Sequence, residues 1–316
     1  MACQAWVSAH ILGLLLLAAC GCSELNSPAE AQNPGEPPLA LLSQWGVKGD
    51  GPGQLDDPQG MAADRIGNVY VADAGSQFVH KFAADGTPLL SFQEDSLKEP
   101  QSIAVDYGGT IYVTDPSRAA VFVVFPMEER DRHRVLRLRT RPSAENSLSV
   151  AVDDDDMVYV FDASIRKVFI FSSRLSLKHA WIAAPAGTPK KPADDIGPLV
   201  LGGDGNLYIA DVAAGRLLRF STEGRLLANI APASAQADPR ISEQFAVSRN
   251  YIFVMDMNGS TLHVWNMDGS PKLDIDLSDR LGQGHRLPPL LAVSPRRDLF
   301  VLDTSARRVF RYHINF

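Results

Sequence analysis

One short phrase recurs six times along the chain: a branched residue, an aromatic residue, two mostly apolar residues and an aspartate. The copies end at Asp73, Asp115, Asp162, Asp211, Asp256 and Asp303. Successive aspartates are 42, 47, 49, 45 and 47 residues apart. A strand-like unit that recurs with a period in the forties is typical of the blades of a β-propeller. The chain is therefore predicted to be all-β, a six-bladed β-propeller with four-stranded blades.

The two best repeats also carry a family resemblance. Residues 58–73 begin with Pro-Gln-Gly-Met-Ala, and residues 100–115 begin with Pro-Gln-Ser-Ile-Ala-Val-Asp. Both motifs resemble the NHL repeat, and the resemblance extends over about residues 42–316. It implies the same propeller fold. It leaves the activity open, because NHL proteins do many different things.

The final repeat has one strand fewer than the others. It contains strand-like segments at 290–293, 299–302 and 309–312, and the sequence then ends at Phe316. An additional strand-like segment, residues 40–45, precedes the first repeat. We expect this segment to be the fourth strand of blade six, because closing the ring removes the exposed sheet edges of an open array.

The first forty residues have the composition of an export signal and a tether. Residues 11–19 form an apolar run that is too short to span a bilayer and has the length of a signal-peptide core. The Leu-Ala-Ala-Cys sequence that ends at Cys20 resembles the lipobox of bacterial lipoproteins. We therefore expect a signal peptide at 1–19, a lipidated cysteine with a disordered tether at 20–39, and the propeller at 40–316. The alternative is a signal peptide whose cleavage releases a soluble protein.

These features predict where the protein resides. Acyl chains on Cys20 would anchor it to a membrane, and the absence of an aspartate directly after this residue resembles outer-membrane sorting in Gram-negative bacteria. We expect a lipid-anchored protein of the bacterial cell envelope, at the outer membrane or the periplasmic face. All three cysteines lie within the first 22 residues, so the repeats contain no disulfide and no thiolate metal site. The net charge of −7 argues against a nucleic-acid partner, and we expect a monomer.

The six repeated aspartates are expected to cap the turn after the second strand and to pair with arginines in that turn. The alternative is a polar pocket. In a propeller, the connection between the second and third strands of a blade lies on the same face as the connection between blades, and ligands usually bind there. Candidate binding residues are those that differ between the repeats on this face. They are Asp57, Glu99, Asn146 and Asp195, each sixteen residues before the aspartate of its repeat, and His285 and Arg286 in the last repeat.

Enzymatic chemistry has less support. Three of these residues, Glu99, Asn146 and Asp195, could mimic the oxygen ligands of a metal-dependent lactonase, with Ca²⁺ as the ion. Of the histidines, only His285 lies near the predicted channel mouth, so the three-histidine zinc site of amidating lyases with NHL-like propellers is not expected. We expect no catalytic residues and no cofactor. The sequence favours a non-catalytic binding or scaffold protein that uses this face to bind a protein, a glycan or a small polar ligand. The alternative is a divalent-metal-dependent hydrolase.

Overall fold

The computed structural model describes residues 37–125, 133–138, 148–183, 196–231, 241–281 and 288–316. These residues belong to one compact unit, Pro37–Phe316, and residues Met1–Glu36 form a separate unit that is not described. Among the described residues, no helix has the length and apolar character needed to cross a membrane.

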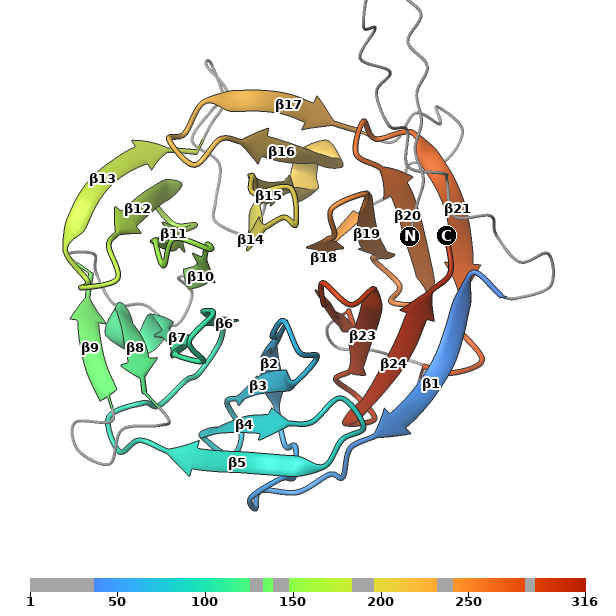
Figure 1. Ribbon diagram of the computed structural model, residues 1–316, viewed down its shortest axis with the longest axis horizontal. Coiled ribbons are helices and arrows are strands. Elements are labelled where there is room, and N and C mark those ends of the chain that lie inside the picture. The colour runs from blue at the N-terminus through green and yellow to red at the C-terminus, as the bar shows by residue number, and fades with distance from the viewer. Residues whose placement is uncertain (1–36, 126–132, 139–147, 184–195, 232–240, 282–287) are drawn as a thin grey trace, which may run out of the picture. The chain divides into compact units, whose positions relative to one another are not determined.

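The described chain forms six antiparallel sheets of four strands each, arranged in a ring (Figure 1). We call the strands of a blade a to d from the axis outward. The first three blades are β2 (Pro58–Ala63), β3 (Val69–Asp73), β4 (Phe78–Phe82) and β5 (Pro88–Gln93); β6 (Ile103–Val105), β7 (Ile111–Asp115), β8 (Ala120–Val124) and β9 (His133–Arg137); and β10 (Leu148–Val152), β11 (Val158–Asp162), β12 (Lys167–Phe171) and β13 (Leu177–Ile182). The predicted six-bladed, all-β propeller is confirmed.

The remaining blades complete the ring. They are β14 (Ile196–Leu201), β15 (Leu207–Asp211), β16 (Arg216–Phe220) and β17 (Leu226–Ile230); β18 (Ile241–Val247), β19 (Tyr251–Asp256), β20 (Thr261–Asn266) and β21 (Pro271–Asp276); and β22 (Leu290–Val293), β23 (Asp298–Asp303), β24 (Arg308–Ile314) and β1 (Leu39–Trp45). Short 3₁₀ helices occupy two of the b–c turns, at Pro116–Arg118 and Val212–Ala214.

The ring is closed by the N-terminal strand, as predicted. Strand β1 pairs antiparallel with β24, from Leu39 opposite Ile314 to Trp45 opposite Val309. The backbone N–H of Asn315 also donates to the carbonyl oxygen of Pro38, at 3.0 Å. Each innermost strand contacts the innermost strand of the next blade, and β22 contacts β2. Blade six is therefore built from both ends of the described chain.

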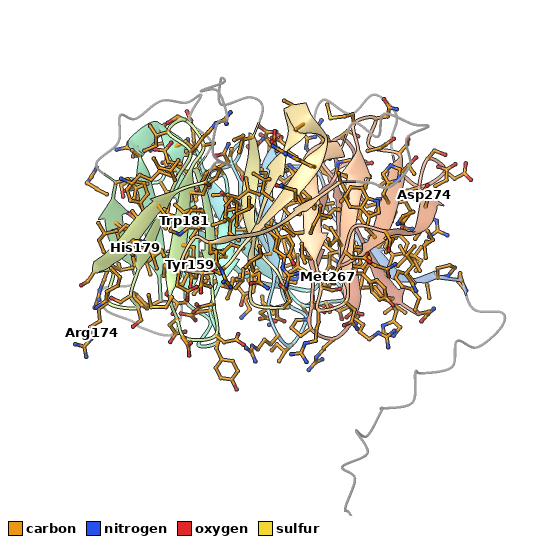
Figure 2. The ribbon with its side chains drawn as sticks, turned by 90° about the horizontal axis from the view of Figure 1, so that it is seen from above. Tyr159, Arg174, His179, Trp181, Met267 and Asp274 are labelled. Atoms are coloured by element: carbon orange, nitrogen blue, oxygen red, sulfur yellow. The ribbon has the colours of Figure 1, made fainter. Side chains whose placement is uncertain are left out.

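The core lies between the blades. Each of six apolar clusters takes its buried side chains mainly from two neighbouring blades, so the blades are held by face-to-face packing. In blades one and three, burial is high in strand b and low in the outermost strand: β3 is fully buried, whereas β13 is mostly exposed. His179 and Trp181 lie on this outer strand, at the side of the ring (Figure 2). Both faces of an inner strand are thus covered by adjacent blades.

Two of the contacts between neighbouring blades have the same three components: a tryptophan, a phenylalanine and a glycine. The Trp45 ring lies 4.6 Å from that of Phe82 in the next blade, and the c–d turn of that blade reaches Trp45 through Gly86. A Cβ atom on Gly86 would lie 2.2 Å from Cγ of Trp45. The second contact joins blades three and four through Trp181, Phe220 and Gly224. A glycine is required in both turns because its φ is positive and a tryptophan ring occupies the space of a side chain.

The aromatic residue of the repeated phrase has a polar contact of its own. In the first four blades it is a tyrosine whose hydroxyl donates to an aspartate in the a–b turn. The pairs are Tyr70–Asp64 (3.2 Å), Tyr112–Asp106 (3.2 Å), Tyr159–Asp153 (2.7 Å) and Tyr208–Asp204 (2.8 Å). Burial raises the pKa of these four tyrosines, and the neighbouring aspartate raises it further. Blades five and six have Phe253 and Phe300 instead, with serines in the turn. The hydroxyl and its acceptor are therefore present or absent together.

Candidate functional site

The repeated aspartates support the fold. Asp73 is fully buried, and its carboxylate accepts the backbone N–H groups of Asp56 and Asp57, each at 2.7 Å, and of Gly75 at 3.2 Å. In blade two, Asp115 accepts the N–H of Lys98 at 2.8 Å. These bonds fix the loop that leads into a blade against the b–c turn of the same blade. The predicted capping of the b–c turn by backbone N–H groups is confirmed at Asp73 but not at Asp115, which makes no such bond within its turn. Each aspartate in these two blades also holds an incoming loop.

The predicted pairing with arginines is confirmed in part. The Arg216 guanidinium lies 2.9 Å from the Asp211 carboxylate, and Nε of Arg118 lies 4.0 Å from that of Asp115. Arg307 instead donates to backbone carbonyl oxygens, including that of Asp56 in the neighbouring blade. In these blades the repeated aspartate is thus a structural feature of the propeller.

The structure describes two of the six predicted binding residues. Asp57 and Glu99 lie in the d–a connections of adjacent blades, with exposed side chains. Their backbone N–H groups bind Asp73 and Asp115, at 2.7 and 3.4 Å. The sixteen-residue spacing on which these predictions depend is thus the spacing of a backbone contact. The other candidates lie outside the described residues: Asn146, Asp195, His285, Arg286 and the lipidation site Cys20.

The sequence pattern did not indicate a Ser–His–Asp grouping, yet the structure brings Ser91, His80 and Asp73 together. Nδ1 of His80 lies 2.9 Å from the Ser91 hydroxyl, and Nε2 lies 3.9 Å from the Asp73 carboxylate. The backbone N–H of Gly53 donates to the same serine, at 3.0 Å. Burial lowers the pKa of His80 to about 4, against the opposing effect of Asp73. Such an imidazole is a weak base at neutral pH, its side chain is fully buried, and Asp73 is occupied by backbone bonds. We interpret the group as packing that fastens the loop of Gly53 to blade one.

Glu243 is the residue on the inner strands that sequence analysis missed. It lies in β18, where the pairing with β19 shifts between Ile241 and Phe245. The partners of these two residues are Asp256 and Val254, so four steps along β18 oppose two along β19. Hydrogen bonds between the buried Ser242 hydroxyl and the backbone of Gln244 hold this double bulge. Bulges of this kind redirect side chains and are common beside binding sites.

The Glu243 side chain is exposed, yet burial raises its pKa above the usual value for a glutamate, with a smaller opposing effect from the Gln244 side chain. The residue is therefore exposed although protein atoms surround part of its side chain. Neighbouring blades cover the faces of β18 and β19 covers its outer edge, so the accessible side is the ring axis or the face from which the strand starts (Figure 1).

Equivalent positions in the other blades show that this residue is not part of the repeat. In each blade we take as reference the residue of strand a whose pairing partner in strand b lies two positions before the repeated aspartate. In blade five this residue is Phe245, which pairs with Val254. The residues two places before it are Gln59, Gln101, Leu148, Gly197, Glu243 and Pro289 in blades one to six. Only blade five carries a charge there. The signal was available in the sequence, but finding it requires the strand registers.

The described residues include no group of three or more histidine, cysteine, aspartate or glutamate side chains with the geometry to hold a metal ion. Of the histidines that the structure describes, His80, His263 and His313 lie on c strands, and His133 and His179 lie on d strands. These are the predicted positions, away from the inner strands.

Comparisons with known proteins identify the fold. No family model matches the chain, and no curated protein matches its sequence. Among solved structures, the chain resembles a catalytically inactive variant of virginiamycin B lyase from Staphylococcus aureus with quinupristin, with a TM-score of 0.58, 9% identity, and coverage of 81% of this chain and 80% of the other. It also resembles a streptogramin B lyase (TM-score 0.55, 10% identity, 82% and 93% covered). A third match is Kuenenia stuttgartiensis hydrazine synthase (TM-score 0.55, 12% identity, 84% and 96% covered). At these identities the likeness shows the propeller fold alone.

Proposed function

We propose that the protein is a non-catalytic binding or scaffold protein, an NHL-type propeller. It would bind a protein, a glycan or a small polar ligand through the face where the d–a and b–c connections meet. The observation that carries this proposal is Glu243, an accessible carboxylate at the start of an inner strand, at a position where the other blades have no charge. The repeated aspartates are used by the fold, whereas no ion pair within the described part of the chain accounts for this charge. Asp57 and Glu99 add exposed acidic groups to the same face.

We also propose that Cys20 carries lipid and anchors the propeller in the bacterial cell envelope, with residues 20–39 as the tether. The support is the Leu-Ala-Ala-Cys sequence and the polar, proline-rich composition of the segment that follows. Metabolic labelling with a radioactive fatty acid tests this part independently. The Cys20→Ala variant should lose the label, and a labelled variant would contradict the proposal.

The binding proposal is tested by affinity capture from detergent-solubilised envelope, with quantification of every captured species. A double variant, Asp57→Asn with Glu99→Gln, and the single variant Glu243→Gln alter the proposed face. Glu223→Gln alters a c–d turn at the opposite end of a blade, where the side chain is exposed. A true ligand should be depleted at least fivefold by a change on the proposed face and retained by Glu223→Gln. A species that all variants capture equally contradicts the use of this face.

An enzyme is the second candidate, because two of the structural neighbours are lyases. The catalytically inactive variant in one of those structures has alanine in place of a histidine, which indicates that this lyase needs that histidine. In this chain, the corresponding hypothesis is a divalent-metal-dependent hydrolase that uses Glu99, Asn146 and Asp195. Metal analysis of the purified protein separates the two candidates. A stoichiometric ion that is lost on Glu99→Gln favours the enzyme, and a metal-free protein with an unchanged Tm in added Ca²⁺ favours the binding protein.

A further inference from the structure

The double bulge in β18 has no counterpart of the same size in the other blades whose registers show a shift at this point. In β2 the shift between Pro58 and Gly60 inserts one residue opposite β3, and in β14 the shift between Ile196 and Leu199 also inserts one. In β18 the corresponding shift inserts two residues, Glu243 among them. Glu243 thus lies in the bulge, at a point where strand a of an unbulged blade would pair regularly with strand b.

Blade four makes room for this glutamate because it has a glycine, Gly197, at the point where the two blades meet. A Cβ atom on Gly197, in strand a of blade four, would lie 3.0 Å from Cβ of Glu243 and 3.0 Å from Cβ of Ala210. The backbones of the two inner strands therefore approach closely, and the carboxylate must extend away from Gly197. The close approach leaves little room beside the base of the side chain, while the residue as a whole is exposed.

The Glu243 carboxylate lacks a cationic partner. Among the described residues, no lysine, arginine or histidine forms an ion pair with it, and its polar neighbour is the neutral Gln244 side chain. Partial burial of a carboxylate disfavours its charged form, and a nearby opposite charge restores it. Two structural carboxylates in this propeller have such partners: Asp298 pairs with Arg311 at 2.8 Å, and Asp204 with Arg219 at 3.0 Å. Glu243 therefore bears a cost of desolvation that no cation among the described residues offsets.

We propose that Glu243 is the subsite for a cationic nitrogen group of the ligand, a protonated amine or a guanidinium. The inference rests on the proposed binding function of this face and specifies the chemistry of its ligand. A nitrogen cation supplies both the charge that the carboxylate lacks and N–H donors for its oxygen atoms, in a charge-assisted hydrogen bond of the strong kind. Gly197 is a positioning residue, because its missing side chain allows the close approach of the strands.

Agmatine, which carries an ammonium and a guanidinium group, is a suitable probe, with butanol and butyrate as neutral and anionic comparisons. Binding is followed by the ¹³C signal of the Glu243 carboxyl carbon, which is assigned by its loss in Glu243→Gln, and by calorimetry. Agmatine should bind saturably at pH 7.5, with at least tenfold weaker binding in Glu243→Gln. Glu223→Gln, which changes a glutamate on the opposite face, should bind like the unmodified protein. Binding should weaken as the pH falls through the raised pKa of Glu243, because protonation removes the charge.

Three results would overturn the assignment: equal binding of butanol and agmatine, unchanged agmatine binding in Glu243→Gln, or a Glu243 signal that responds to Ca²⁺ at lower concentrations than to agmatine. The last result would assign the carboxylate to a metal. Failure of the broader proposal looks different. Agmatine binding at Glu243 without any face-dependent capture from the envelope removes the scaffold function and leaves the subsite. Capture that depends on Asp57 and Glu99 but not on Glu243 keeps the scaffold function and removes the subsite.

Discussion

The buried histidine of blade one should make the propeller sensitive to acid. His80 has no exposed surface, and burial lowers its pKa from 6.5 to about 4. The unfolded chain therefore binds a proton on this residue at a higher pH than the folded protein does. Stability rises with pH wherever the unfolded state binds more protons. The contribution of neutral His80 is fully present above pH 6.5 and is lost as the pH falls from 6.5 towards 4.

The magnitude follows from the two pKa values. One pKa unit corresponds to about 1.4 kcal/mol, so the complete shift removes about 3 kcal/mol of unfolding free energy below pH 4. At pH 5, the same linkage removes about 2 kcal/mol relative to pH 8. Protonation would place a cation beside the Asp73 carboxylate, 3.9 Å from Nε2, but desolvation outweighs this attraction. It would also disturb the contact with Ser91.

Urea unfolding of the protein and of His80→Gln, at intervals between pH 8 and pH 4.5, measures this contribution. Glutamine is polar but does not titrate, so the difference in unfolding free energy between the two proteins isolates His80. This difference should shrink by about 2 kcal/mol between pH 8 and pH 5. His263, seven residues after its aspartate like His80 but partly exposed, supplies the matched variant His263→Gln. A constant difference for His80→Gln would refute the reasoning, and an equal change in both variants would assign it to strand-c histidines in general.

Two contacts between structural elements give further tests by thermal or urea unfolding. Gly86→Ala should destabilise the propeller by about 2–3 kcal/mol, because its Cβ would lie 2.2 Å from the Trp45 ring. Gly109 has a similar φ and no atom within 4 Å of an added Cβ, so Gly109→Ala measures the cost of the backbone conformation alone. An equal loss of stability in both variants would contradict a role for Trp45. Tyr159→Phe should cost about 1–2 kcal/mol, because it removes the 2.7 Å hydrogen bond to Asp153; an unchanged midpoint would show that the turn does not need it.

The fold was predictable because a propeller repeats its local chemistry. Each strand b ends at an aspartate whose position is set by contacts inside the same blade, so six copies in the sequence give six blades in space. Closure of the ring by β1 followed from the same counting, and its pairing with β24 confirms it. The strand boundaries of blade six were also close: a strand-like segment was predicted at 290–293, and β22 spans Leu290–Val293. Periodicity and turn residues are short-range signals, and here they agree with the global arrangement.

The candidate site was less accessible to sequence reasoning. Counting back sixteen residues from the aspartate found Asp57 and Glu99, but that spacing reports a backbone hydrogen bond and says nothing about the side chains. Glu243 lies thirteen residues before Asp256, in a strand whose two inserted residues disrupt that count. A bulge is a property of pairing between strands, so no local pattern in β18 alone reveals it. The grouping of His80 with Ser91 was missed for the same reason, since it depends on the register of β4 and β5.

The contrast between Asp73 and Glu243 shows how repetition separates structure from function in this molecule. The carboxylate that recurs in every blade meets equivalent backbone groups in blades one and two, where N–H donors stabilise its charge. Glu243 occurs once, lies in a larger bulge than its counterparts, and is partly desolvated with no cation beside it among the described residues. The propeller fold does not depend on a charge at this position, because uncharged residues such as Gln59 and Gly197 occupy the equivalent positions of other blades. Under the proposal above, a ligand, and not the propeller, determines the residue at this position.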